Sequence, residues 1–520
     1  MITLSIIFAT ATIALGLARW WRLPTVPVLI LSGVVLAVSG IQGDNEQLQQ
    51  MLLLGLTFLV FFAGTELNPR RLGAQRRAAI QVGVIQFILL GGIGLGVALL
   101  IGFDLVSGFY IALALAASST LVVVRLLQQR AQLFEPLGRL VLGVLLVQDV
   151  LVIFFISLLS NLAEGGWGIA IGLAEVAGLM LLSWILIRWL TPYLLLKLSF
   201  DEENLLLVVL AILFAFVGLS QIMAVPLVVG AFLAGVSLSA FPVNGLIRAQ
   251  LLSLSHFFLA VFFVALGASL RMPMGSELIL AGILIVLVVG LTPPLVTLIA
   301  EKAGLSARAA IESGLLLAQT SEFSIIVALA GLQQNHIGDG ILSVIALVTV
   351  ATMILTPFIA TNKIVWRLMK LHPSRWQNRP VSPPSGHVLL IGCGETGRIL
   401  LEHLIGSGER ILVVDDDPAI VNQLRARGID AIRGDGADYR LLNASGARTA
   451  RIVISTMRRL KDHESVLKFT KSGRVVARVF EEAEAERIRR RGGIPVLYSH
   501  AAAGEFLRWF GQEFAARTTS

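Results

Sequence analysis

Cysteine and charged residues are both scarce in this sequence of 520 residues. Cys393 is the only cysteine, so the chain can form no intrachain disulfide and no cysteine-based metal cluster. Only 14% of the residues are charged, whereas 56% are hydrophobic and the mean hydropathy is +0.84. A typical soluble domain is much less apolar than this. The scarcity of charge therefore excludes a wholly soluble protein and predicts a chain that lies mostly within a membrane.

The apolar residues form successive blocks up to about residue 371, and after residue 384 the composition is that of an ordinary soluble α/β domain. The first block lacks a basic leader and a convincing cleavage site, so we expect a first span rather than a signal peptide. The predicted fold is a polytopic α-helical membrane domain at 1–362 followed by one soluble domain. We predict thirteen spans, at 2–18, 24–40, 48–66, 79–101, 107–127, 139–161, 168–190, 203–221, 223–241, 250–270, 276–300, 308–331 and 339–361.

The net charge is +8, and the basic residues of the membrane half lie at the ends of these spans and in the connections between them. If the N-terminus is outside, the inner connections hold fourteen Lys and Arg residues and the outer ones hold only Arg271. This bias follows the positive-inside rule, so no nucleic acid partner is needed to explain the basic charge. An odd number of spans then places the C-terminal domain in the cytoplasm.

Two polar residues interrupt the span predicted at 139–161. Gln148 and Asp149 stand near the middle of the apolar run from Leu140 to Leu159. A carboxylate at the centre of a membrane helix costs about 2.5–3.5 kcal/mol on insertion scales, so it normally faces a partner, an ion or water. Asp149 is either a structural residue satisfied by neighbouring donors or a site for a cation or a proton. We favour the ion or proton site.

Small polar runs interrupt two further spans: residues 116–120 read AASST, and residues 318–323 read AQTSEF. Irregular backbone at membrane depth is tolerated where it lines a cavity and its carbonyl groups can hold a cation. The runs lie seven spans apart, as expected if spans 1–6 and 8–13 are two repeats of opposite orientation. Close packing of small residues is the alternative for either run taken alone. Glu322, in the second run, belongs either to the site or to a structural pair.

Four segments of the membrane half, in the right order, resemble the Kef-type cation:proton antiporters. They are LTFLVFFAGTELNPRRL at 56–72, LALAASSTLVVVRLL at 113–127, GRLVLGVLLVQDVLVI at 138–153 and LLAQTSEFSIIVA at 316–328. The resemblance implies a homodimer in the bacterial cytoplasmic membrane, with elevator-like alternating access and two crossed broken helices. By position it assigns ion or proton binding to Asp149, Gln148, Ser118, Ser119, Thr120, Gln319, Ser321 and Glu322, with potassium or sodium held at Asp149.

One departure from this family concerns lysine. Many relatives carry a lysine in the span before the second broken helix, but residues 286–296 here read VLVVGLTPPLV and carry no charge. The resemblance therefore leaves the ion stoichiometry open.

The chemistry of one carboxylate supports the same function. A carboxylate can hold a proton or a dehydrated cation, but hardly both at once. If the two compete for Asp149 and the site opens alternately to each side, the result is electroneutral exchange of potassium for protons. Sodium is the nearest alternative, because both ions can use the same oxygen ligands. A potassium channel with a regulatory domain is a second alternative, and the lack of a TVGYG-like filter argues against it.

The C-terminal part opens with a predicted linker at 363–385, basic at first and then rich in proline. After a short apolar strand come Gly392, Gly394 and Gly397 in the pattern GxGxxG, followed by an amphipathic helix. Asp415 ends the next predicted strand, where a ribose-binding acid belongs. With further βα units to residue 480, this predicts a Rossmann-like domain at 386–497 that binds NAD(H) or AMP. An NAD-dependent oxidoreductase is a further alternative, but no second substrate domain follows, so we expect no enzyme activity.

The same stretch resembles the TrkA-N (RCK-type) regulatory domains of potassium transport proteins, through VVDDDP at 413–418 and RGDGADYRLL at 433–442. The resemblance places Asp435 near the adenine moiety and implies paired domains that gate the attached transporter. A further regulatory subunit and membrane lipid are expected partners, and nucleic acid is not. The tail at 498–520 is predicted to be an amphipathic helix of undefined use.

Overall fold

The computed structural model describes residues 2–21, 23–40, 45–66, 76–130, 132–133, 136–160, 165–190, 202–223, 225–239, 245–371, 384–470 and 473–518. The chain divides into two compact units. The first comprises Met1–Ala303 and Ile311–Ile364, and the second comprises Gly304–Ala310 and Val365–Ser520. Most of the predicted proline-rich linker, residues 372–383, lies outside the described residues.

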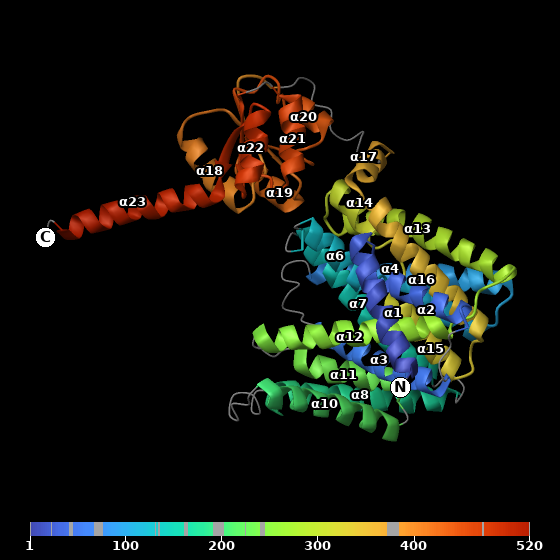
Figure 1. The fold of residues 1–520 in the computed structure, drawn as a ribbon. Coiled ribbons are helices and arrows are strands. Elements are labelled where there is room, and N and C mark those ends of the chain that lie inside the picture. The colour runs from blue at the N-terminus through green and yellow to red at the C-terminus, as the bar shows by residue number, and fades with distance from the viewer. Residues whose placement is uncertain are drawn as a thin grey trace. The chain divides into compact units, whose positions relative to one another are not determined.

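The first unit is built from apolar helices (Figure 1). They are α1 (Ile2–Trp20), α2 (Thr25–Val38), α3 (Asn45–Glu66), α4 (Arg76–Ile101), α5 (Leu105–Ala116), α6 (Thr120–Gln129), α7 (Pro136–Ser160), α8 (Gly165–Ile185), the π-helical η3 (Leu186–Leu190), α10 (Glu202–Ile222), α11 (Leu227–Ser239), α12 (Gly245–Ser269), α13 (Ser276–Lys302), α14 (Ala307–Leu316), α15 (Glu322–Gln333) and α16 (Asp339–Ile359). A further helix, α17 (Asn362–Leu371), begins in the first unit and continues into the second.

Every predicted span contains helix, and the fifth and the twelfth are each interrupted at the predicted polar run. Among the described residues, seven helical segments are long and apolar enough to cross a membrane, and six shorter helices are apolar as well. The polytopic helical class is therefore confirmed, and the count of thirteen crossings stays a prediction.

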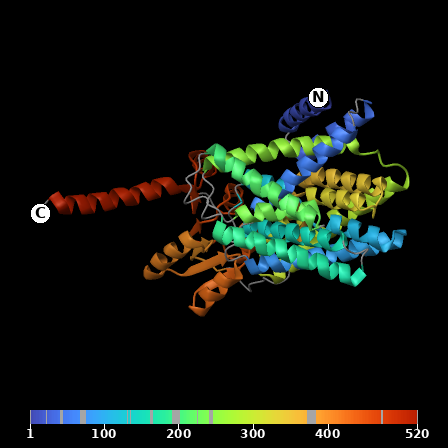
Figure 2. The ribbon, with the colours of Figure 1, turned by 90° about the horizontal axis from the view of Figure 1, so that it is seen from below.

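The helices of the first unit pack in two groups. One contains α4, α5, α7, α13, α15 and α16, and the other contains α1, α2, α3, α8, α10, α11 and α12. Within the second group α8, α10, α11 and α12 lie together, as both views show (Figures 1 and 2). The groups meet where α7 contacts α8 and α11, and where α16 contacts α2.

Two pairs of glycines allow close backbone contact in the second group. On α3 and α11, Gly64 faces Gly235; a Cβ added at either residue would overlap a backbone carbonyl oxygen of the facing helix. On α2 and α12, Gly33 faces Gly267 in the same way. If spans 1–6 and 8–13 are two repeats, span 2 corresponds to span 9 and span 3 corresponds to span 10. The contact between spans 3 and 9 then corresponds to the contact between spans 10 and 2, as the expected repeats require. Small residues at such contacts let membrane helices approach closely.

The second unit contains a six-stranded parallel sheet in the order β3-β2-β1-β4-β5-β6. Its strands are β1 (Val388–Ile391), β2 (Ile411–Asp415), β3 (Asp430–Arg433), β4 (Ile452–Ser455), β5 (Val475–Val479) and β6 (Ile494–Leu497). Its helices are α18 (Glu395–Gly406), α19 (Pro418–Ala426), α20 (Tyr439–Ala444), α21 (Leu460–Phe469), α22 (Glu482–Arg490) and α23 (Tyr498–Thr518). This strand order is that of a Rossmann fold, so the predicted fold of this unit is confirmed.

The sheet is covered by helices on both faces because its central strands are apolar throughout. Leu389 of β1 packs in one buried cluster with α21 and α22, whereas Leu390 packs in another with α18 and α19. Alternate residues of a strand point to opposite faces, which explains the division. Strand β6 was not predicted from the sequence, because its apolar run is only four residues long and contains Pro495. The predicted C-terminal helix is present as α23, which extends away from the sheet (Figure 1).

The glycine contact predicts a sharp difference between two substitutions. Gly235→Val should lower the free energy of unfolding by about 1–3 kcal/mol, because the new side chain overlaps the backbone of α3. Gly282→Ala on α13 is the control, since a Cβ there meets no atom within 4 Å. Reversible unfolding of the purified protein in mixed micelles measures both values. Equal stability of the two variants would contradict the close contact of α3 and α11.

Candidate functional site

The two helix breaks of the first unit lie against each other. Between α5 and α6 the backbone is extended, with Ala117 at φ −103° and ψ 144°. The Ser118 hydroxyl donates to the carbonyl oxygen of Leu317, in the other break, at 2.9 Å. The Ser119 hydroxyl donates to Oε2 of Glu322 at 2.8 Å. The predicted meeting of AASST and AQTSEF is thus seen in the structure.

Helix α7 places an amide and a carboxylate beside the first break. Gln148 is fully buried, and its Oε1 accepts a hydrogen bond from the backbone N–H of Ser118 at 3.0 Å. Asp149 is 5% exposed, and its Oδ2 accepts from the Thr120 hydroxyl at 3.3 Å. The N–H groups in the first turn of an α-helix have no partners within the helix. The side chains of Gln148 and Asp149 lie at this end of α6.

A second carboxylate reaches the same break from α15. Glu322 is the first residue of that helix and is 4% exposed. The helix N-terminus favours a negative charge. Asp149 and Glu322 therefore contact neighbouring residues of one break, Thr120 and Ser119. The site has two acidic side chains rather than one.

The second break is held mainly by its own residues and by α16. Ser321 caps α15 in a reciprocal pair with Ser324. The Gln319 amide nitrogen donates to the carbonyl oxygen of Leu316 at 3.3 Å, and its Oε1 is buried without a hydrogen-bond partner among the described residues. Gln319 therefore offers a buried oxygen that a cation could use.

The second break is also bonded to a threonine face that sequence reasoning missed. Thr349, Thr352 and Thr356 share one face of α16. Thr352 accepts from the backbone N–H of Thr320 at 3.2 Å, and Thr356 donates to the carbonyl oxygen of Ala318 at 3.4 Å. The three threonines are spaced three and four residues apart within an apolar block, and this pattern could have indicated a polar helix face.

Two other buried polar features were also passed over. Arg130, at the end of α6, pairs with Glu312 of α14 at 3.2 Å, so a charge pair joins one half of each broken helix. Glu312 is a carboxylate within a predicted span, and this position could have indicated that it has a charged partner. Gln86 of α4 is fully buried, and its amide atoms have no hydrogen-bond partner among the described residues.

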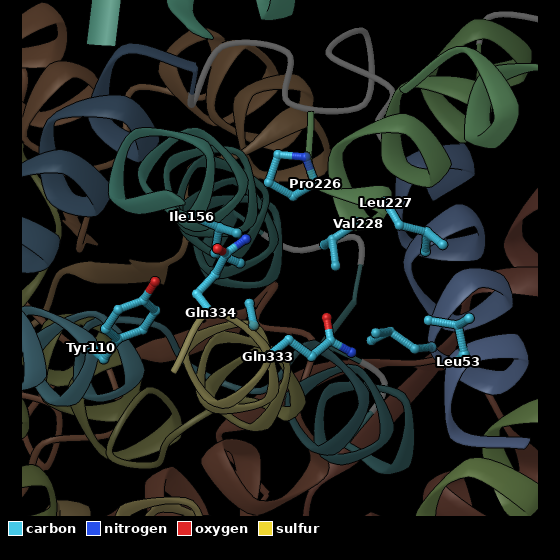
Figure 3. Close-up of a pocket in the computed structure, with 10 residues that line it drawn as sticks. Leu53, Tyr110, Ile156, Pro226, Leu227, Val228, Gln333 and Gln334 are labelled. Carbon is cyan, nitrogen blue, oxygen red and sulfur yellow. The ribbon is translucent and has the colours of Figure 1, made fainter. Parts of the chain in front are cut away.

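A cavity of about 60 Å³ lies between the two helix groups (Figure 3). One side is formed by Tyr110 of α5, Ile156 of α7 and the C-terminal end of α15, and the other by α3 and the start of α11. The amides of Gln333 and Gln334 line it (Figure 3). Ile156 stands seven residues after Asp149 on α7, a rise of about 10 Å. The cavity is roomy enough for water, and Tyr110, Gln333 and Gln334 give it polar partners.

The predicted nucleotide site of the second unit has the required backbone. Gly392 has φ +87°, and a Cβ at Gly397 would overlap the Gly392 carbonyl oxygen, so both positions need glycine. Gly394 precedes α18 without any side-chain cap, which leaves N–H groups for a pyrophosphate. Asp415 ends β2 beside the turn, accepts from the Cys393 N–H, and has a pKa raised by burial. These residues fit a dinucleotide or a mononucleotide.

Asp435, predicted to approach adenine, lies in the turn after β3. Its Oδ1 accepts from the Ala437 N–H at 2.9 Å, and its Oδ2 forms an ion pair with Arg308 at 2.8 Å. The approach of Asp435 to adenine stays a prediction, and the ion pair was not foreseen.

Comparisons with known proteins match both units. Residues 6–362 match the sodium/hydrogen exchanger transmembrane family, and residues 388–503 match the TrkA-N domain. A glutathione-regulated potassium-efflux system protein KefC from Enterobacter sp. is 26% identical over 444 residues, covering 82% of this chain and 70% of the relative. A protein of the same name from Salmonella paratyphi B is 25% identical over 484 residues, covering 89% and 77%.

Among solved structures, the sodium proton antiporter MjNhaP1 from Methanocaldococcus jannaschii shares the fold. It is 12% identical, covers 71% of this chain and 98% of its own, and has a TM-score of 0.51.

The bond between Gln148 and the first break predicts a local effect. Gln148→Leu leaves the Ser118 N–H buried without that acceptor, at a cost of about 1–3 kcal/mol. Amide hydrogen exchange of the peptide around 116–120 should become faster by roughly 5- to 150-fold. Thr57→Val is the control, since the buried Thr57 hydroxyl bonds only within α3 in the structure. Unchanged exchange in Gln148→Leu would contradict the bond.

Proposed function

Since the chain belongs to the sodium/hydrogen exchanger family, we propose that it is an antiporter that exports potassium and admits protons. One observation carries this proposal: the buried Asp149 lies beside two helix breaks that bond to each other. The curated relatives named as potassium-efflux proteins support potassium as the cation.

The proposed exchange takes place at Asp149. When the carboxylate is ionised, Asp149 holds a potassium ion together with the Thr120 hydroxyl and carbonyl oxygens of the breaks. When the carboxylate is protonated, its negative charge is gone and the ion leaves. Because one charge serves either ligand, each cycle moves one potassium ion against one proton and no net charge.

The other site residues position the breaks. Gln148 holds the Ser118 amide, and Glu322 holds the Ser119 hydroxyl from the opposite break. Ser321 begins α15, and the free oxygen of Gln319 completes the oxygen ligands. No lysine stands in residues 286–296 to replace the cation at Asp149. The proton is therefore the competitor in this scheme.

Alternating access follows from the two helix groups. The glycine contacts make the group of α2, α3, α11 and α12 a rigid frame, and the group with both breaks moves against it. The cavity beside Gln333 and Gln334 lies between the groups. In the orientation set by the basic connections it is on the outer side, so it serves as the outer access route. We place the protein in the bacterial cytoplasmic membrane as a lipid-embedded homodimer.

The second unit would regulate transport by binding a nucleotide. Gly392, Gly394 and Gly397 would hold a pyrophosphate, and Asp415 would accept from ribose hydroxyls. NAD(H) and AMP both meet these requirements. The bound nucleotide would act by changing how the paired domains pack, so no chemical reaction of the nucleotide is required. An ancillary subunit would add a further level of control.

The exchange site predicts loss of transport in one variant. Asp149→Asn keeps the size of the side chain and removes its charge, so potassium-driven proton flux in proteoliposomes should fall to the level of empty vesicles. A pH-sensitive dye inside the vesicles measures the flux, with potassium, sodium and lithium compared. Asp104→Asn, which changes only the N-cap of α5, is the matched control. Full activity of Asp149→Asn would end the proposal. Flux with sodium but not with potassium would show that sodium is the exchanged cation.

A further inference from the structure

The second unit contains a short segment that comes from between α13 and α15. Gly304–Ala310 clusters with the Rossmann-like unit, and the residue after it, Ile311, belongs to the first unit. The segment contains the start of α14, which runs to Leu316 at the edge of the second break. It is therefore joined through a single helix to the predicted exchange site.

Arg308 attaches this segment to the domain through two carboxylates. Its guanidinium lies 2.8 Å from Oδ2 of Asp435 and 3.0 Å from Oδ1 of Asp462. It also lies 5.1 Å from the centre of the Trp366 ring. The Arg308 side chain is only 8% exposed. A guanidinium can meet two acids at once because its donors form a planar fork.

A further contact joins the segment to the domain. Arg433 donates to the carbonyl oxygen of Leu305 at 3.3 Å. Burial alone would lower the pKa of Arg308, but the charges of Asp435 and Asp462 raise it above its usual value. The arginine therefore stays charged.

Arg308 attaches the segment beside the predicted nucleotide site. Asp435 follows β3, which pairs with β2, and β2 ends at Asp415, the predicted ribose-binding residue. The backbone N–H of Gly434 donates to the carbonyl oxygen of Asp415 at 2.8 Å, so the two acidic turns are directly joined. A nucleotide whose ribose is held by Asp415 would reach the carboxylate that Arg308 uses.

We propose that Gly304–Ala310 is a latch that competes with the nucleotide for Asp435. With the site empty, Arg308 ties the start of α14 to the domain. Binding of a nucleotide releases Arg308 and frees the helix that leads to the second break. This inference rests on the proposed function for its consequence in transport, but not for the competition itself. By reciprocity, the latch must weaken nucleotide binding as much as the nucleotide weakens the latch.

The competition is tested by binding to the full-length protein in detergent. Arg308→Gln should bind NADH about threefold to tenfold more tightly than wild type in a fluorescence titration, because its competitor is gone. Lys302→Gln, an exposed basic residue of the same connection, is the control and should bind as wild type does. AMP is titrated in the same way. Equal or weaker binding of both nucleotides by a folded Arg308→Gln variant would overturn the latch, as would the absence of binding in every variant.

A second variant guards against misfolding, because Arg308→Gln leaves two acids without their cation. Arg308→Gln combined with Asp462→Asn removes one of these charges and should also bind NADH more tightly than wild type. In the wild-type protein, saturating NADH should speed amide exchange in peptides covering 304–310. Unchanged exchange with NADH bound would contradict the release of the segment.

Transport assays separate the latch from the antiporter. In proteoliposomes, NADH should change the potassium-driven flux of wild type and Lys302→Gln, and leave that of Arg308→Gln unchanged. If wild type moves no protons but NADH still loosens 304–310, the proposed function fails and the latch stands. If transport proceeds and Arg308→Gln responds to NADH as wild type does, the latch fails alone.

Discussion

The need to satisfy backbone polar groups away from water shapes the first unit. An interrupted helix leaves N–H and carbonyl groups without helical partners, and lipid offers none. The two breaks supply partners for each other: Ser118 bonds to Leu317, and Ser119 bonds to Glu322. Gln148 and the threonines of α16 complete the set. The same groups that make the breaks tolerable form the surroundings of Asp149, so the stability of the breaks and the proposed ion binding depend on one network.

This network lies in one of two helix groups, and the contrast between the groups supports movement. The frame group is locked by backbone contacts at Gly33, Gly64, Gly235 and Gly267, where no larger side chain fits. The group with the breaks meets the frame through few elements, and a cavity separates them at Tyr110. A frame held by close backbone contacts, beside a group that holds both breaks and with a cavity between them, is the arrangement that the proposed alternating access requires.

The sequence predicted those features that depend on local composition. Polar runs within apolar blocks located both breaks, an acid within a span located Asp149, and the glycine pattern with Asp415 predicted the Rossmann-like unit. Features that depend on distant partners were not predicted. The partners of Arg308 lie more than a hundred residues away, and Arg130 meets Glu312 from another helix. Strand β6 lies at the sheet edge, and its run of four apolar residues is short and contains Pro495, so it did not indicate a strand.

The central claim is that one carboxylate is shared between a proton and a cation, and it is tested by how the apparent KM for potassium depends on pH. Proteoliposomes with wild-type protein give this value from the dye signal at a series of pH values. Competition predicts that KM rises about tenfold for each pH unit below the pKa of the site, while the maximal rate at saturating potassium stays constant. A KM that is independent of pH, with a maximal rate that falls instead, would show that proton and cation use separate sites.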